Sequence, residues 1–220
     1  MIDLADFSAV IFDMDGLVLD TESTYTIARQ QAASVLGYDF SGDFCQSLSG
    51  LHSNDVAQKL LARCGAGFDL HAFNRLSGEC WRDHVNIHGI NIKHGFSELL
   101  DLLIRQKIPY CLATNSLMTN ALECLELAGI KGVFSLIISR EQVRHGKPAP
   151  DIFIKAAELL QADIGRCLVL EDSDVGILAA SKAGAHSVFI PSIAPVDPST
   201  IALCDFVMED LVRLTNAIRA

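Results

Sequence analysis

Five short runs of apolar residues, spread along the chain, constrain the fold more than any other feature. They are continuous rather than alternating, and Val, Ile and Leu are frequent in them. Strands buried on both faces of a parallel sheet have this pattern. The runs are SAVIF (8–12), PYCLAT (109–114), FSLIIS (134–139), CLVLE (167–171) and HSVFI (186–190). Segments with helical periodicity separate most of them, which predicts an α/β fold with a doubly wound parallel sheet.

Residues 20–88 break this alternation directly after the first predicted strand. The segment shows three or four helical patterns, including ESTYTIARQQAASVLG (22–37) and FDLHAFNRLSGECWRDHV (68–85), and no convincing strand. A helical period of 3.6 residues in so long a segment indicates an inserted unit without a sheet of its own. We therefore expect a Rossmann-like catalytic core formed by residues 1–19 plus 89–220, and an inserted all-α helical cap domain at residues 20–88.

Charge and cysteine usage limit the partners and the compartment. The net charge of −10 provides no basic face for nucleic acid or for an anionic membrane. The N-terminal MIDLADF lacks the positive charge of a signal peptide, and no apolar run approaches the roughly 18 residues that span a bilayer. Seven cysteines occur singly, as reduced thiols do in a cytosol. We expect a cytoplasmic monomer that binds neither nucleic acid nor membrane.

Polar and ionisable residues follow several of the predicted strands. Ligands of open parallel sheets bind beyond the carboxyl ends of the strands, so these residues are expected to share one site. Each group alone is typical of a turn or a helix cap, but their common position at strand ends favours function. The groups are Asp13, Asp15 and Gly16; Thr114, Asn115 and Ser116; Gly146, Lys147 and Pro148; and Glu171, Asp172 and Ser173.

The carboxylates among these residues predict a bound cation. Asp13, Asp15, Glu171 and Asp172 would repel one another at one sheet edge unless a cation lay between them. Hard oxygen ligands select Mg²⁺, which binds one or two carboxylates together with a substrate phosphate. Lys147, the Thr114 hydroxyl and backbone N–H groups at a helix start would then bind the remaining phosphate oxygens. The residues thus indicate a ligand that carries a phosphate group.

Two carboxylates one strand period apart suit a two-step displacement. Asp13 is expected to attack the phosphate and form an aspartyl-phosphate, which divides a difficult displacement into two easier ones. Asp15 can face the same cavity and reach the leaving-group oxygen. It would protonate the leaving group and then serve as the base for water.

These motifs resemble those of the haloacid dehalogenase superfamily, in the branch of β-phosphoglucomutase and the sugar-phosphate phosphatases. FDMDGLVLDTE is similar to the DxDG motif, ATNS to the Ser/Thr motif, GKPAPDIF to the lysine motif and LEDSDVG to the acidic metal motif. The resemblance covers nearly the whole chain.

The resemblance implies a role for each matching residue. Asp13 would be the nucleophile and a metal ligand, and Asp15 the general acid/base whose backbone carbonyl also meets Mg²⁺. Thr114, Asn115 and Lys147 would bind phosphate. Asp172 would be a direct metal ligand and Glu171 a direct or water-mediated one. The helical insertion would be the cap that closes over the site and selects the substrate.

Two departures from the mutase pattern favour hydrolysis. β-Phosphoglucomutase-like proteins carry a histidine where this chain has Tyr25 or Thr26, and an arginine where SGLHSND offers His52 and Ser53. A mutase must grip a bisphosphate and shield its phospho-enzyme from water. We therefore expect a phosphatase of small phosphorylated metabolites, sugar phosphates foremost, with a β-phosphoglucomutase-like mutase as the alternative. His52 is a possible substrate contact in the cap.

Two non-catalytic alternatives remain open at this point. A receiver-type signalling module also combines strand-end aspartates, Thr and Lys around Mg²⁺, but such modules are shorter and lack an insertion after the first strand. A binding protein on the same scaffold would turn over no phosphoester.

Overall fold

The computed structural model describes residues 2–48, 53–65, 67–192 and 196–219. The chain forms two compact units, a core unit of Met1–Leu19 with Ile92–Ala220 and a helical unit of Asp20–Asn91. The two connecting segments pair with each other, because Leu19 bridges Ile92 and the Asp20 N–H donates to the Asn91 carbonyl at 2.8 Å. The helical unit therefore extends to Asn91, three residues beyond His88, the last residue of its last helix.

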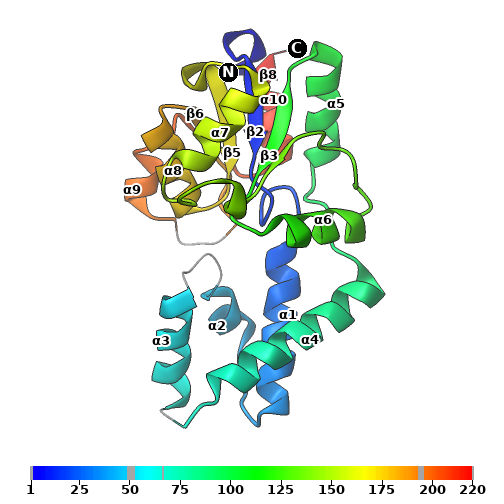
Figure 1. Ribbon diagram of the computed structural model, residues 1–220, viewed down its shortest axis with the longest axis vertical. Coiled ribbons are helices and arrows are strands. Elements are labelled where there is room, and N and C mark those ends of the chain that lie inside the picture. The colour runs from blue at the N-terminus through cyan, green and yellow to red at the C-terminus, as the bar shows by residue number, and fades with distance from the viewer. Residues whose placement is uncertain (1, 49–52, 66, 193–195, 220) are drawn as a thin grey trace. The chain divides into compact units, whose positions relative to one another are not determined.

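A six-stranded parallel sheet forms the centre of the core unit, which confirms the predicted fold class (Figure 1). The strands lie in the order β4 (Ile137–Ile138), β3 (Tyr110–Ala113), β2 (Ala9–Phe12), β5 (Cys167–Glu171), β6 (His186–Phe189) and β7 (Phe206–Val207). β2 lies between β3 and β5, so the chain's connections diverge to its two sides. A doubly wound sheet has its ligand site at the carboxyl end of such a strand. The two-residue β7 was not predicted from the sequence.

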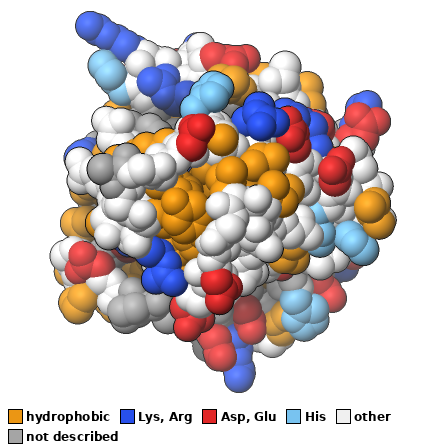
Figure 2. Space-filling view, turned by 90° about the horizontal axis from the view of Figure 1, so that it is seen from below, with side chains coloured by type: hydrophobic (Ala, Val, Ile, Leu, Met, Phe, Trp, Pro, Cys, Tyr) orange, Lys and Arg blue, Asp and Glu red, His pale blue; other side chains and the backbone are white. Residues whose placement is uncertain are grey.

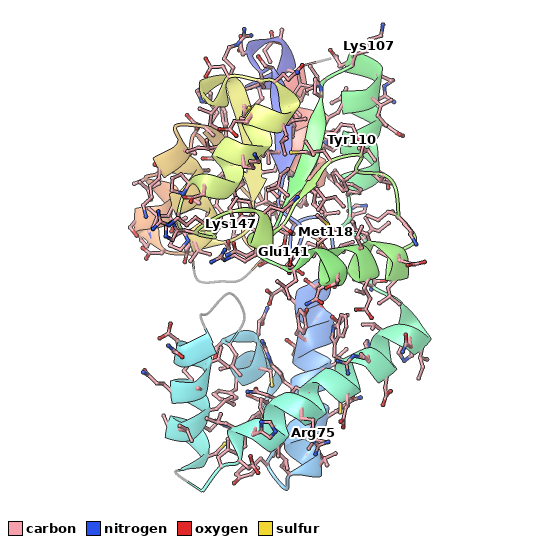
Figure 3. All side chains as sticks on the ribbon, in the orientation of Figure 1. Arg75, Lys107, Tyr110, Met118, Glu141 and Lys147 are labelled. Carbon is pink, nitrogen blue, oxygen red and sulfur yellow. The ribbon has the colours of Figure 1, made fainter. Side chains whose placement is uncertain are left out.

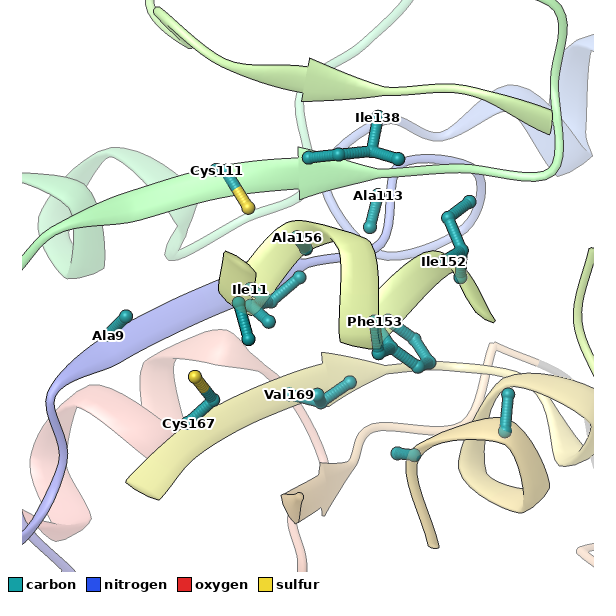
Figure 4. Packing of buried hydrophobic residues seen from close by; sticks show 13 residues of the cluster. Ala9, Ile11, Cys111, Ala113, Ile138, Ile152, Phe153, Ala156, Cys167 and Val169 are labelled. Carbon is teal, nitrogen blue, oxygen red and sulfur yellow. The ribbon is translucent and has the colours of Figure 1, made fainter. Parts of the chain in front are cut away.

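Successive residues of β2 face different helices. Ile11 belongs to a buried cluster with Phe153 of α7, as Figure 4 shows, whereas the ring of Phe12 meets Phe96 of α5 with 5.8 Å between centroids. Successive side chains of a strand point to opposite faces, so helices cover both faces of the sheet. Within its described residues, the core unit contains the helices α5 (Phe96–Gln106), α6 (Met118–Leu127), α7 (Asp151–Leu160), α8 (Asp174–Ala183), α9 (Pro198–Ile201) and α10 (Leu211–Ala217).

Short elements complete the core unit. β1 (Ile2–Asp3) and β8 (Ile218–Arg219) pair in parallel as a separate two-stranded sheet near the two ends of the chain. Single 3₁₀ turns lie at Leu4–Asp6, Arg140–Gln142 and Ile164–Arg166. The second of these turns directly follows the edge strand β4 and leads toward the segment that carries Lys147.

The described residues of the helical unit form helices and no strand. The helices are α1 (Thr21–Val35), α2 (Gly42–Gln46), α3 (Ser53–Cys64) and α4 (Leu70–His88). Side chains cap three of the helix starts, because Asp20 accepts from the Ser23 N–H, Ser41 from Phe44 and Asp69 from Ala72. A buried aromatic cluster that includes Phe40, Phe68 and Phe73 joins the helices. The unit therefore has a hydrophobic core of its own.

The surface is mixed in character. In the face shown by Figure 2, acidic and basic side chains are interspersed around a central group of hydrophobic ones. Across the described ranges, no helix combines the length and the apolarity needed to cross a bilayer.

The aromatic cluster gives a stability prediction for the helical unit. Phe73 is 2% exposed, and its ring lies 5.7 Å from that of Phe40 and 5.3 Å from that of Phe68. We expect Phe73→Ala to lower the free energy of unfolding of this unit by about 3–5 kcal/mol, because it removes buried surface and leaves a cavity. Trp81, the single tryptophan of the chain, lies in α4, so its fluorescence during urea unfolding reports on this unit.

A matched control is available in α1. Val35 is 67% exposed, and Val35→Ala is expected to change the free energy of unfolding by about 0.5 kcal/mol or less. Equal unfolding midpoints for Phe73→Ala and Val35→Ala would contradict the assignment of Phe73 to the core of the unit.

Candidate active site

The carboxyl ends of β2, β3 and β5 bring residues from three of the predicted motifs to one edge of the sheet. Asp13 directly follows β2 and its N–H donates to the Leu170 carbonyl at 3.0 Å, while Thr114 directly follows β3. In Figure 3, Lys147 lies at the end of the sheet where β3 leads to Met118, and Lys107 lies at the opposite end. Strand pairing thus fixes the residues that surround Lys147.

Lys147 is buried at this edge and makes three side-chain contacts. Its Nζ donates to Asp13 Oδ1, to Glu171 Oε1 at 2.6 Å and to the Ala113 carbonyl at 2.9 Å. Burial by itself lowers the pKa of a lysine, but the Asp13 and Glu171 charges outweigh it and raise the pKa of Lys147 above its ordinary value. Lys147 is therefore a fixed cation that holds the ends of β2, β3 and β5 together.

Asp13 carries the electrostatic strain of the site. Burial raises the pKa of Asp13 well above its ordinary value; the Lys147 charge opposes this, and the charges of Glu171 and Asp15 add to it. One ammonium group therefore does not compensate the carboxylates that surround it. A further cation beside Asp13 would stabilise its ionised form.

Glu171 joins Lys147 to the start of α8. Its Oε1 accepts from Lys147, while its Oε2 accepts from the Asp172 N–H at 3.0 Å, the Ser173 N–H at 3.0 Å and the Ser173 hydroxyl at 2.9 Å. A carboxylate is stabilised at a helix N-terminus by these N–H groups and by the helix dipole. Both oxygens of Glu171 are thus engaged within the protein.

Gly176 is a site residue that the sequence analysis did not identify. A Cβ atom at this position would lie 1.8 Å from the Glu171 Cδ and 1.9 Å and 2.2 Å from its two oxygens. Only glycine allows the Glu171 carboxylate to lie over the first turn of α8. The glycine within LEDSDVG was the available signal, because a glycine inside a helix needs a packing reason.

Asp13, Glu171 and Asp172 form an acidic cluster that suits a metal ion. One ligand oxygen from each lies within 4.8 Å of the others, and all three residues are buried. Gly16, with φ +86°, leaves room for Asp172, because a Cβ there would lie 2.1 Å from its Oδ2. Carboxylate oxygens are ligands for hard cations such as Mg²⁺, so the donor set fits the predicted metal.

Ser192 supports this cluster and was also missed from the sequence. Its hydroxyl donates to Asp172 Oδ2 at 2.5 Å, and it follows β6 at the same edge of the sheet. A single serine beyond a strand carries no motif, so no sequence signal distinguishes it.

Asp15 lies against the hydroxyl groups that follow β3. Its Oδ2 accepts from Ser116 Oγ at 2.9 Å and from Thr114 Oγ1 at 3.4 Å. Thr114 Oγ1 in turn accepts from the Ser116 N–H at 3.0 Å. The structure therefore brings Asp15 and Thr114 together as predicted neighbours, and it adds Ser116, which the sequence analysis noted but assigned no role.

The other predicted positions are placed differently. The Asn115 side chain contacts the main chain of Lys147, with its Nδ2 donating to the Lys147 carbonyl at 3.1 Å and its Oδ1 accepting from the Lys147 N–H at 2.9 Å. Tyr25 stacks on Trp81 inside the helical unit, with 5.6 Å between ring centroids. His52 lies outside the described residues.

The sequence is similar to those of known proteins over most of its length. A family model described as haloacid dehalogenase-like hydrolase matches residues 10–190. Fructose-1-phosphate phosphatase YqaB of Escherichia coli is 30% identical over 83% of this chain and 95% of its own length. β-Phosphoglucomutase of Bacillus subtilis is 28% identical over 86% of this chain and 85% of its own length.

A solved structure supports the fold. The crystal structure of a HAD family hydrolase from Deinococcus radiodurans, with bound phosphate and sodium, superimposes with a TM-score of 0.82. It is 24% identical and the match covers 97% of this chain and 95% of that one.

The close approach of Gly176 to Glu171 gives a prediction for the site. We expect Gly176→Ala to displace the Glu171 carboxylate from Lys147 and to lower the free energy of unfolding of the core unit by about 1–3 kcal/mol. Urea unfolding followed by far-UV circular dichroism measures this change.

Gly78 provides the control, because it also lies inside a helix but a Cβ there meets nothing within 4 Å. Gly78→Ala is expected to stabilise the protein by about 0.5–1 kcal/mol through helix propensity. Stabilisation by Gly176→Ala as well would show that Glu171 does not require the space.

Proposed function

Because the chain belongs to the haloacid dehalogenase-like hydrolase family, we propose that it is a Mg²⁺-dependent phosphatase of small phosphorylated metabolites, sugar phosphates foremost. The observation that carries the proposal is the contact of Asp13 with the buried Lys147 beside Glu171 and Asp172. A carboxylate nucleophile, a fixed cation and a metal donor set at one edge are the groups that phosphoryl transfer to a carboxylate requires. The likeness to a fructose-1-phosphate phosphatase supports a sugar phosphate as the substrate.

Asp13, Asp172 and the backbone carbonyl of Asp15 would hold the metal ion. Glu171 would contribute through water, since its oxygens already contact Lys147 and the start of α8. When bound, Mg²⁺ neutralises carboxylate charge and polarises a phosphoryl oxygen.

In the first step, an oxygen of Asp13 attacks the phosphorus atom of the substrate. The bond from phosphorus to the ester oxygen breaks, and Asp15 gives its proton to that oxygen as the alcohol leaves. Formation of the acyl-phosphate removes the charge of the Asp13 carboxylate, so the Lys147 donor that contacts Asp13 becomes available to a phosphoryl oxygen. Lys147 thereby follows the negative charge from the nucleophile to the transferred group.

In the second step, water attacks the phosphorus atom of the aspartyl-phosphate. Asp15, now ionised, takes a proton from the water, and the bond from phosphorus to Asp13 breaks to release inorganic phosphate. The Ser116 and Thr114 hydroxyls, which donate to Asp15 Oδ2, would hold its carboxyl group in position for both steps. Both aspartates then return to their starting states.

A β-phosphoglucomutase-like activity is the second candidate, favoured by the likeness to the Bacillus subtilis enzyme. A mutase must bind a second phosphate and keep water from its phospho-enzyme. The position of the expected histidine is occupied by Tyr25 or Thr26, neither of which offers an imidazole, and the Tyr25 ring stacks on Trp81. Membership in a hydrolase family and the inserted helical unit favour an enzyme over a phospho-aspartate signalling module.

Product analysis separates hydrolysis from isomerisation. With Mg²⁺ and a set of hexose, pentose and triose phosphates, we expect release of inorganic phosphate and no accumulation of an isomeric sugar phosphate. Chelation of the metal should lower the rate by about 100-fold or more, because the carboxylate charge is then uncompensated, and added Mg²⁺ should restore it. Interconversion of hexose phosphates without phosphate release would select the mutase instead.

Replacement of the nucleophile tests the mechanism. We expect Asp13→Asn to lower kcat/KM by about 10⁴-fold or more, because an amide cannot form the acyl-phosphate. The exposed Asp101 of α5 offers the same chemical change away from the site, and Asp101→Asn should retain full activity. An Asp13→Asn variant within tenfold of the unsubstituted protein would refute the aspartyl-phosphate route.

A further inference from the structure

We propose that the Asn115 side chain is a positioning residue that fixes Lys147, and that it is not a phosphate ligand. The inference rests on the proposed function, since it assigns the route by which Asn115 supports phosphate transfer. The resemblance implies that Asn115 binds phosphate, and the inference assigns its side chain a role exerted through Lys147 instead.

Asn115 forms a reciprocal pair with the main chain of Lys147. Its Nδ2 donates to the Lys147 carbonyl at 3.1 Å, and its Oδ1 accepts from the Lys147 N–H at 2.9 Å. A carboxamide can imitate the peptide group of a neighbouring strand in this way, with one donor and one acceptor. The Asn115 side chain therefore joins the loop after β3 to the segment that carries Lys147, with the hydrogen-bond pattern of two paired strands.

Two neighbouring residues shape the contact. Gly146 allows it, because a Cβ atom there would lie 2.5 Å from Asn115 Oδ1. Arg140 lies on the other side of Gly146, with its Cδ 2.5 Å from the same Cβ position. The main-chain N–H of Arg140 donates to the Ser116 carbonyl at 3.1 Å. The segment that carries Lys147 is thus fitted against the residues that follow β3.

Fixing the main chain of Lys147 matters because its side chain is long. Because the lysine side chain has several rotatable bonds, a displaced Cα would readily move the ammonium group. The Nζ must reach Asp13, Glu171 and the Ala113 carbonyl at once. A misplacement of about 1 Å can lower a rate by about 100-fold.

The alternative is that the Asn115 amide binds phosphate directly. Its Nδ2 would then have to turn from the Lys147 carbonyl, and its Oδ1 would repel a phosphate oxygen or leave the Lys147 N–H without this partner. A contact through the Asn115 main-chain N–H requires neither change. The side chain and the main chain of Asn115 therefore serve different purposes.

A double-mutant cycle tests the inference. The four proteins are the unsubstituted chain, Asn115→Ala, Lys147→Met and the double variant, assayed with an aryl phosphate at enzyme concentrations high enough for the weakest. We expect Asn115→Ala to lower kcat/KM by about 10–100-fold, and by less than about twofold when Lys147 is already Met, because residues that act through one another are not additive. Asn120→Ala, an exposed change on α6, should stay within twofold.

Independent effects would overturn the inference. If the losses from Asn115→Ala and Lys147→Met multiply in the double variant, Asn115 acts without Lys147, as a direct ligand would. An Asn115→Ala variant with unchanged kcat/KM would overturn it as well. Thermal unfolding of all four proteins identifies any loss of fold, which would appear equally in both backgrounds.

Binding of inorganic phosphate by the same four proteins, measured by calorimetry with Mg²⁺, separates this inference from the proposed function. Non-additive losses of phosphate affinity in a protein that hydrolyses no phosphoester would refute the phosphatase and keep the positioning role. Hydrolysis of phosphoesters, with losses of phosphate affinity that multiply in the double variant, would keep the phosphatase and refute the positioning role. An unsubstituted protein that neither hydrolyses nor binds phosphate would refute both.

Discussion

The buried contact of Lys147 with Asp13 and Glu171 is the interaction on which the rest of the site depends. Burying a single charge of either sign in this position costs free energy. The cost is offset only when an opposite charge lies within hydrogen-bonding distance and in good geometry. The geometry is supplied by three parallel strands, since Asp13 directly follows β2, Ala113 is the last residue of β3 and Glu171 is the last residue of β5. Removing one partner would leave an uncompensated charge in the interior. The order of the strands and the chemistry of the site are therefore stabilised together.

This contact does not by itself make a site that accepts phosphate. Two further carboxylates, Asp15 and Asp172, lie at the same edge, and burial already raises the pKa of Asp13. A phosphate anion entering such a field is repelled unless a divalent cation enters with it. The hydroxyls of Ser116 and Ser192, each donating to one carboxylate, lower the repulsion without adding charge. Metal and substrate binding are for this reason expected to be coupled.

The sequence predicts the fold and the charged residues because both follow from patterns that are local. A continuous apolar run identifies a buried strand, and a carboxylate directly after it must lie at the sheet edge. Gly176 and Ser192 were missed because their roles depend on which atoms approach them in three dimensions. Asn115 was identified as phosphate-binding from the resemblance alone. The contact of its side chain with the main chain of Lys147 follows from no local pattern, because the two residues are 32 positions apart in the chain. Two residues of β7 were too short a run to carry a pattern.

The described site accounts for the phosphoryl group more fully than for the alcohol that leaves it. Asp13, Lys147 and the acidic cluster are the groups proposed to meet the phosphoryl group, and all of them belong to the core unit. Relatives matched over most of the chain nevertheless bear the names of a fructose-1-phosphate phosphatase and a β-phosphoglucomutase. Since the motifs are those of one family, the difference between such activities must arise from residues beyond the motifs. Cleavage and substrate choice are thus separable properties. The helical unit, in which Tyr25 or Thr26 stands where a mutase-like chain is expected to have histidine, is where we expect substrate choice to reside.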